Sequence, residues 1–181
     1  MSSTTTMTRT GSCLCGGVKL RIEGEPFRTN LCHCTSCQKF SGAFCASLAV
    51  YKSEQVTITP TDPTLTPHTY VDTTPESGNV LERSFCGRCG SPLTGRRRGG
   101  DGSGIGGGGG GGGLPEELVA VAVGVVDGPK DDLRPQFEFF CVRRASWLGE
   151  VGGATAFPKL PPPPPQPPVE AEAEVAVEKG S

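Results

Sequence analysis

Apolar and polar residues alternate over several short segments of this chain, and short β-strands are the elements that such alternation predicts. No long segment shows the 3.6-residue period of an amphipathic helix, and one short helix is expected at residues 35–42. Residues 118–126 are almost wholly apolar, which predicts a strand buried on both faces. We therefore expect a mainly β domain. The strand candidates are residues 18–22, 44–50, 56–59, 80–85, 118–126 and 137–142.

Segments of biased composition set the expected domain limits. Residues 1–10 are rich in Ser and Thr and are expected to form a disordered leader, so that one folded domain covers residues 11–158. Within it, residues 99–113 are nearly pure glycine and predict a flexible insertion, because glycine has no side chain to bury. Residues 159–181 begin with a proline run and become acidic, which predicts a disordered tail.

Net charge and cysteine content narrow the function classes. A net charge of −2 argues against a general nucleic-acid binder, which would carry a basic excess. No apolar run reaches membrane-spanning length, and the first residues lack the apolar segment of a secretory signal, so we expect no membrane partner. Nine cysteines in such a chain indicate a reducing compartment, the cytoplasm or the nucleus, where thiols bind metal rather than form disulfides.

Two cysteine pairs have the spacing of a closed zinc site. Cys13 and Cys15 form a C-x-C pair, and Cys86 and Cys89 form a C-x-x-C pair in which a glycine follows each cysteine. Four thiolates satisfy tetrahedral zinc, and glycine lets the backbone curl around the sulfurs through positive φ. A zinc ion here would close a loop across the domain and add its binding energy to folding. A disulfide scaffold is the alternative, but two C-x-C-type pairs bridge poorly to each other.

A third group, Cys32, Cys34 and Cys37, offers only three thiolates. These sulfurs can converge on a second zinc ion while His33 points away, which leaves one coordination position open. Soft zinc prefers sulfur and deprotonates a coordinated thiol, so the site suits capture of a small thiol that then attacks a small aldehyde. The alternative is a second structural zinc, with His33, His68 or another residue as fourth ligand.

The remaining chemistry-bearing residues are expected to be structural. Cys45 and Cys141 lie in apolar runs, where cysteines usually act as small core side chains. His68 lies between Pro67 and Thr69 and is expected in a loop, and Trp147 is expected to cover the core.

Three stretches resemble the glutathione-dependent formaldehyde-activating enzyme family, which is grouped with the centromere protein V domain. They are G-S-C-L-C-G-G-V at 11–18, C-H-C-T-S-C-Q-K at 32–39 and F-C-G-R-C-G-S-P-L at 85–93. Residues 121–127 and 144–148 also look like the family's last strands. The resemblance implies an Mss4-like fold, a structural zinc on Cys13, Cys15, Cys86 and Cys89, and a second zinc on Cys32, Cys34 and Cys37.

The same resemblance implies a carbon–sulfur lyase that joins formaldehyde to glutathione, giving S-hydroxymethylglutathione, with Cys32, Cys34 and Cys37 as the catalytic residues. A different class of function stays open: a non-catalytic zinc module that carries glutathione or binds a macromolecular partner. A methionine sulfoxide reductase on a similar scaffold would need a catalytic cysteine in a late strand. The surroundings of Cys141, F-F-C-V-R-R, do not match that enzyme.

Overall fold

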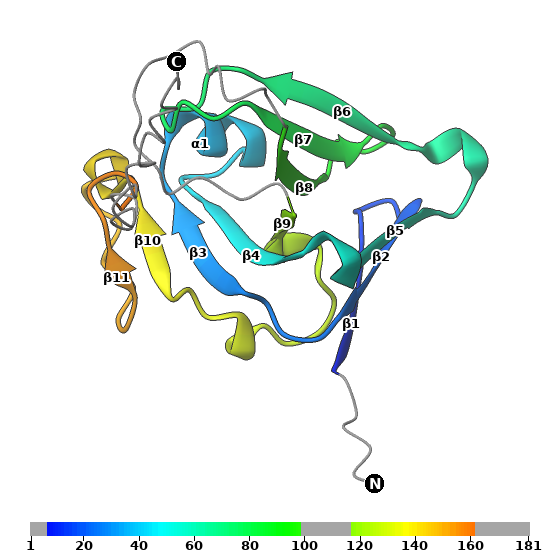
Figure 1. The fold of residues 1–181 in the computed structure, drawn as a ribbon, viewed down its shortest axis with the longest axis horizontal. Helices are drawn as coiled ribbons and strands as arrows, with labels where there is room; N and C mark the ends of the chain where they lie inside the picture. The colour runs from blue at the N-terminus through cyan, green and yellow to red at the C-terminus, as the bar shows by residue number, and fades with distance from the viewer. Residues whose placement is uncertain (1–6, 99–116, 162–181) are drawn as a thin grey trace, which may run out of the picture.

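A three-stranded antiparallel sheet packs against an eight-stranded sheet in the computed structural model, which describes residues 7–98 and 117–161 (Figure 1). The strand orders are β1-β2-β5 in the small sheet and β11-β10-β3-β4-β9-β8-β7-β6 in the large one. The mainly β class expected from the sequence is confirmed. The strands are β1 (Thr8–Ser12), β2 (Val18–Glu23), β3 (Arg28–Cys32), β4 (Ala46–Lys52), β5 (Val56–Pro60), β6 (Pro67–Asp72), β7 (Leu81–Cys86), β8 (Pro92–Arg97), β9 (Leu118–Ala122), β10 (Phe137–Phe139) and β11 (Thr155–Ala156).

Helical structure in the described residues is short. The helix α1 (Thr35–Ser41) begins after Cys34 and ends where Gly42 takes a left-handed conformation with φ of 63°. This matches the helix expected at residues 35–42, and Gly42 ends it because glycine adopts positive φ without a Cβ clash. Single 3₁₀ turns cover Ser53–Gln55, Pro63–Leu65, Val123–Val125, Asp131–Leu133 and Cys141–Arg143.

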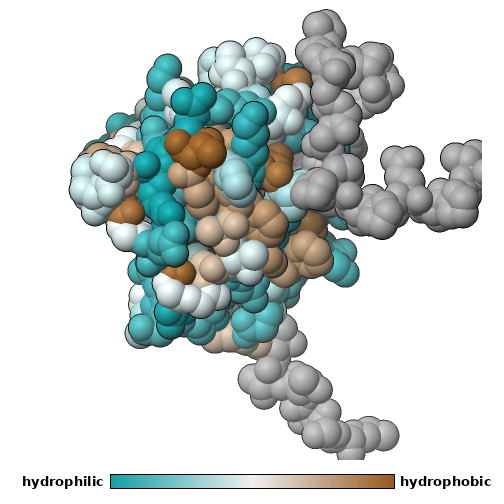
Figure 2. Space-filling view, turned by 90° about the vertical axis from the view of Figure 1, so that its left-hand side faces the viewer, coloured by the Kyte–Doolittle hydropathy of each residue, from teal (hydrophilic) through white to brown (hydrophobic). Residues whose placement is uncertain are grey.

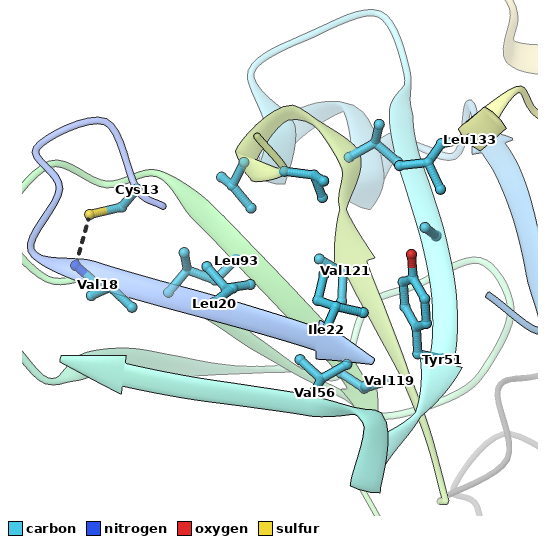
Figure 3. Close-up of a cluster of buried hydrophobic side chains, with 14 of the residues drawn as sticks. Cys13, Val18, Leu20, Ile22, Tyr51, Val56, Leu93, Val119, Val121 and Leu133 are labelled. Carbon is cyan, nitrogen blue, oxygen red and sulfur yellow. Dashed lines mark hydrogen bonds between the residues drawn. The ribbon is translucent and has the colours of Figure 1, made fainter. Parts of the chain in front are cut away.

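The main core lies between the two sheets (Figure 3). Every second residue of β2 is buried, so Val18, Leu20 and Ile22 form its inner face. They pack with Val119 and Val121 of β9, and with further side chains from β4 and β8. The alternation that predicted β2 therefore places one face of the strand in the core and the other in solvent.

Side chains on the opposite face of the large sheet are also buried, because Val50, Leu118 and Ala120 form a separate cluster there. Strand β9 is buried on both faces. This confirms the first half of the buried strand that the sequence predicted at residues 118–126. The predicted strand at 118–126 nevertheless ends at Ala122, where the chain turns into a 3₁₀ helix. The apolar pattern could not show this because Val123 and Val125 stay buried after the turn.

The last strands form one side of the molecule, which faces the viewer in Figure 2. Apolar side chains gather across the middle of this face, and polar ones surround them. Strand β10 pairs in parallel with both β3 and β11. The strand expected at 137–142 ends at Phe139, because Phe140 takes a positive φ of 58° and leads into a 3₁₀ turn at Cys141–Arg143.

Several boundaries differ from those expected. Strand β1 begins at Thr8, so the last residues of the expected leader pair with β2; the polar composition concealed a strand whose buried side chain is Arg9. His68 lies in strand β6 opposite Phe85 rather than in a loop. The glycine-rich insertion at 99–113 and the tail beyond Pro161 lie outside the described residues.

Candidate functional site

Two hairpin ends bring four cysteines together, and we call Cys13, Cys15, Cys86 and Cys89 the four-cysteine cluster. Cys13 and Cys15 follow β1, Cys86 ends β7, and Cys89 lies in the turn between β7 and β8. All four sulfurs lie within 4.8 Å of one another. Cys15 Sγ is 3.7 Å from Cys86 Sγ, close to the sulfur separation of about 3.8 Å in a tetrahedral zinc site with Zn–S bonds of about 2.3 Å. The cluster therefore has the shape of a closed metal site.

Backbone and hydroxyl donors support thiolates in this cluster. The Val18 N–H donates to Cys13 Sγ at 3.2 Å (Figure 3). The hydroxyl of Ser91 lies 3.2 Å from Cys89 Sγ, and this hydrogen bond lowers the pKa of the Cys89 thiol to about 5. Donors of this kind favour the charged form of a ligand and hold it in position.

The two glycines that follow Cys86 and Cys89 are required for different reasons. Gly90 has a φ of 72°, as predicted for a turn that curls around sulfur. Gly87 does not have positive φ, and the prediction for it is wrong. A Cβ at Gly87 would lie 2.7 Å from Nε2 of His68, so this glycine is required by the close approach of strand β6.

A second group of sulfurs gathers where β3 meets α1, and we call Cys32, Cys34 and Cys37 the cysteine trio. Cys32 ends β3, Cys34 is the residue that caps the amino end of α1, and Cys37 lies in the first turn of the helix. Their sulfurs lie within 4.8 Å of one another, and all three residues are buried. The Cys37 N–H donates to Cys34 Sγ at 3.4 Å, so the start of the helix itself orients one sulfur.

Mutual hydrogen bonds place negative charge on this trio. Bonds from the thiols of Cys32 and Cys37 lower the pKa of the Cys34 thiol to about 3, and the bond to Cys34 raises the pKa of Cys32. Three sulfurs that share protons in this way are a donor set for a soft divalent cation, which replaces the protons. The residues present therefore fit a zinc ion as well as the four-cysteine cluster does.

A buried arginine lies beside the trio. Arg83 Nε donates to Asp72 Oδ2 at 2.7 Å, and both side chains are buried. The guanidinium lies 5.0 Å from the ring centroid of Phe40, over its face. Burial lowers the pKa of Arg83, but the hydrogen bond to Asp72 and the charge of Cys37 outweigh it and raise the pKa overall. The ion pair with Asp72 thus holds the positively charged guanidinium of Arg83 close to the sulfurs of the trio.

The histidines proposed as alternative fourth ligands lie elsewhere. His33 is fully buried and points away from the sulfurs, as expected, with Nε2 2.8 Å from Glu138 Oε1. His68 contacts Gly87 and Phe85 near the other cluster. Among the described residues, the group that could hold a metal here consists of the three cysteines alone.

Two further expectations concern Cys45 and Cys141, expected as core side chains, and Trp147, expected to cover the core. Cys45 and Cys141 are only partly buried, and they belong to neither cluster. Trp147 does not cover the core: it is 66% exposed and meets Phe44, itself 59% exposed, edge to face at 4.6 Å. The prediction for Trp147 is wrong because an exposed aromatic neighbour, invisible in the sequence, provides its packing.

A pocket opens next to the trio on the outer face of the large sheet. Its walls include all three cysteines, and its cavity volume is about 120 Å³, below the roughly 300–1,000 Å³ of drug-sized ligand sites, so it suits a small ligand. The surface of the walls is mainly apolar, from residues such as Leu48, Val50 and Phe139. Two arginines, Arg28 and Arg83, are the charged residues among its lining besides the thiols.

Sequence reasoning did not find either arginine. For Arg28 a signal existed: Arg28, Asn30 and Cys32 alternate along β3, so all three face one side once residues 28–32 are recognised as a strand. For Arg83 no local signal existed, because its role depends on strand pairing that brings β7 beside β6 and β8.

Comparisons with known proteins agree with this geometry. The fold and the two clusters define a β protein with two thiolate-rich candidate metal centres. A family model described as glutathione-dependent formaldehyde-activating enzyme matches residues 8–108, more than half of the 181-residue chain, including both clusters. This chain belongs to that family, and its β scaffold is of the expected Mss4-like class. Residues 121–127 and 144–148, which also resembled the family, lie beyond the match.

No curated protein is similar enough to match. Among solved structures, the crystal structure of a Rhodobacter sphaeroides protein from a structural genomics programme is similar at 19% identity. The similarity covers 67% of this chain and 91% of that one, with a TM-score of 0.44. Within the described ranges, no helix is long and apolar enough to span a membrane.

Proposed function

We propose that this protein is a carbon–sulfur lyase that forms and cleaves the adduct of a thiol with a small aldehyde, glutathione and formaldehyde being the pair that the family's description gives. The observation that carries the proposal is the position of the cysteine trio, whose three sulfurs converge at the wall of an apolar pocket. A fourth sulfur, from a substrate, has room to approach from that pocket.

Zinc is the proposed metal of both clusters, held by the four-cysteine cluster as a structural ion and by the trio as a second ion. When bound at the trio, zinc would supply a soft positive centre that takes a further sulfur and lowers the pKa of a thiol. The chain's own part is to hold three thiolates in fixed positions, through the end of β3 and the cap of α1.

The pocket residues prepare the reactants. Apolar walls exclude water, which strengthens charge interactions within the site. Arg83 is held by Asp72 and keeps a positive charge beside the sulfurs. In the forward reaction the substrate sulfur forms a bond to the aldehyde carbon, the carbon–oxygen π bond opens, and the thiol proton ends on the oxygen as a hydroxyl. The reverse reaction breaks the same carbon–sulfur bond and regenerates thiol and aldehyde.

Isotopic exchange tests this proposal directly. With ¹³C-formaldehyde and glutathione at equilibrium, the purified protein should accelerate exchange between free formaldehyde and the S-hydroxymethyl adduct, measured by NMR exchange spectroscopy. Cys34→Ser should abolish the acceleration and lower bound zinc from about two ions per chain to about one, since the trio loses a ligand while the four-cysteine cluster is kept.

The control is Cys45→Ser, which removes a thiol outside both clusters and the pocket lining and should change neither zinc content nor exchange. Exchange no faster than in buffer with the wild-type protein would refute the lyase for glutathione. A Cys34→Ser protein that still binds two zinc ions would refute the proposed ligand set.

A non-catalytic carrier of a thiol is the second candidate. One observation favours it: the pocket lining contains, among the described residues, no histidine or carboxylate that could act as a general acid or base. For a carrier, glutathione would bind in a manner that depends on Cys34, but the exchange rate would stay at its value in buffer. The cytoplasmic or nuclear location stays a prediction from cysteine content.

A further inference from the structure

A row of five residues crosses the sheet beneath the pocket. Strand register pairs Arg28 with Val50, Val50 with Ala120, Ala120 with Gly95, and Gly95 with Arg83. All five line the pocket. The row thus begins and ends in an arginine, and its middle is built from apolar or very small residues.

The small residues of this row create the space. A Cβ at Gly95 would meet nothing within 4 Å, although the glycine lies in the interior of β8. Ala120, its neighbour in β9, projects only a methyl group from a strand rich in valine and leucine. Glycine inside a strand weakens the strand and commonly marks a place that another group approaches closely. The pocket floor is therefore shaped for the body of a ligand.

The two arginines of the row differ in charge balance. Arg83 keeps its charge and has a counter-charge in Asp72, although its Nη2 is buried without a partner. Arg28 has no ion pair or side-chain hydrogen bond with any residue in the described ranges, and its Nε is buried without a partner. Its guanidinium lies 5.6 Å from the ring centroid of Phe139, and burial lowers its pKa. A partly buried cation without a counter-charge is costly, and an anionic ligand group would offset that cost.

Arg28 lies on the same strand as a sulfur of the trio. Arg28 and Cys32 are four residues apart on β3, about 13 Å between Cα atoms at the rise of a strand. The guanidinium lies over the ring of Phe139, the residue paired with Cys32, so Arg28 and Cys32 both lie beside the same aromatic residue. Leu48 and Val50 form the wall beside this line.

We propose, on the basis of the function above, that the preferred thiol has an apolar body and one carboxylate that pairs with Arg28. Its sulfur then lies at the cysteine trio and its body lies over Ala120 and Gly95. Glutathione fits this lining less well, because its amides, amino group and second carboxylate would lose water against mainly apolar walls. A short apolar mercapto acid makes one ion pair and leaves no polar group without a partner.

Binding measurements with matched thiols test the proposal without relying on activity. Isothermal titration of the zinc-containing protein would compare 6-mercaptohexanoate, its neutral counterpart 6-mercapto-1-hexanol, and glutathione. We expect 6-mercaptohexanoate to bind about tenfold more tightly than either, which is the contribution of one charge-assisted hydrogen-bonded pair. Equal affinity for the acid and the alcohol, or tighter binding of glutathione, would overturn the inference.

Variants assign the preference to particular residues. The acid-to-alcohol ratio is the affinity for 6-mercaptohexanoate divided by the affinity for 6-mercapto-1-hexanol. Arg28→Met should bring this ratio to about one, while the alcohol still binds within about twofold of its wild-type affinity. Arg28→Lys should keep part of the ratio. Gly95→Val should weaken both ligands alike without lowering the melting temperature, since its side chain enters empty space. Gly124→Ala, an exposed glycine with open space around it, is the control and should change nothing.

The outcomes separate this inference from the lyase proposal. An Arg28-dependent preference without faster exchange of formaldehyde with either glutathione or 6-mercaptohexanoate would refute the lyase and leave the ligand class standing. Faster exchange with an unchanged acid-to-alcohol ratio in Arg28→Met would support the lyase and refute the role of Arg28. If Arg28→Met does not fold, Arg28→Gln takes its place as a polar, uncharged variant: a ratio near one supports the ion pair, and a ratio equal to that of wild type overturns it.

Discussion

At the scale of single residues, two aspartates with the same local bonds isolate the contribution of a buried charge. Asp72 Oδ1 accepts from the N–H and hydroxyl of Thr74, and Asp62 Oδ1 accepts from the same groups of Thr64. Asp72 is buried and also binds Arg83, whereas Asp62 is exposed and, within the described residues, binds no arginine. Asp72 therefore differs from Asp62 in its burial and in the ion pair that holds Arg83 beside the trio.

Asp72→Asn should therefore destabilise the protein by about 3 kcal/mol, because it leaves the Arg83 guanidinium buried without its counter-charge. Asp62→Asn should cost less than about 1 kcal/mol, since only exposed turn bonds weaken. Urea unfolding at one fixed zinc concentration measures both changes. Equal costs for the two variants would show that the ion pair contributes nothing to stability.

Residue identities predicted the candidate metal ligands, whereas they did not predict the other residues that line the pocket. The two cysteine clusters could be assigned because their spacing along the chain is itself the signal of convergence. Arg83 and Asp72 carry no such signal, since each becomes part of the site only through pairing between strands. The prediction for Trp147 fails for the same reason: its partner Phe44 is distant in sequence.

At the scale of elements, the sequence predicts strands with clean alternation and misses short or polar ones. Strand β2 alternates strictly, and its predicted limits differ from the observed ones by one residue. Strands β1, β3, β6 and β8 contain Thr, Arg, Gly or Pro at inward or central positions, which hides the period of two. Turns that keep apolar residues buried, as at Val123–Val125, cannot be told from a continuing strand by pattern alone.

The turn between β7 and β8 offers a test of backbone conformation at the four-cysteine cluster. Gly90 has a φ of 72°, and a Cβ there would have no atom within 4 Å, so Gly90→Ala adds backbone strain and no clash. We expect a loss of about 1 kcal/mol, the penalty of a non-glycine residue in the left-handed region, measured by urea unfolding. Gly124→Ala has the same open space at negative φ and should be neutral or slightly stabilising. A neutral Gly90→Ala would contradict the requirement for positive φ.

At the scale of the whole molecule, the two clusters serve different parts of the fold. The four-cysteine cluster joins the β1–β2 hairpin of the small sheet to the β7–β8 turn of the large sheet, and Cys15 and Cys86 are 71 residues apart. The cysteine trio spans only residues 32–37, within one strand end and one helix. A cross-link stabilises a fold more when it closes a longer stretch of chain, so only the first cluster should determine folding.

Removing one ligand from each cluster should therefore have unequal effects. Cys86→Ser should lose about 4 kcal/mol of stability, the loop-closure contribution of a cross-link over such a length, and its melting temperature should fall by about 15 °C. Cys37→Ser should lose one zinc ion yet melt within a few degrees of wild type, because the trio closes no long loop. Calorimetry with zinc analysis of the same samples measures both quantities, and Cys45→Ser controls for the loss of a thiol. Equal falls in melting temperature for Cys86→Ser and Cys37→Ser would mean that both clusters are structural, which would remove the physical basis for an exchangeable position at the trio.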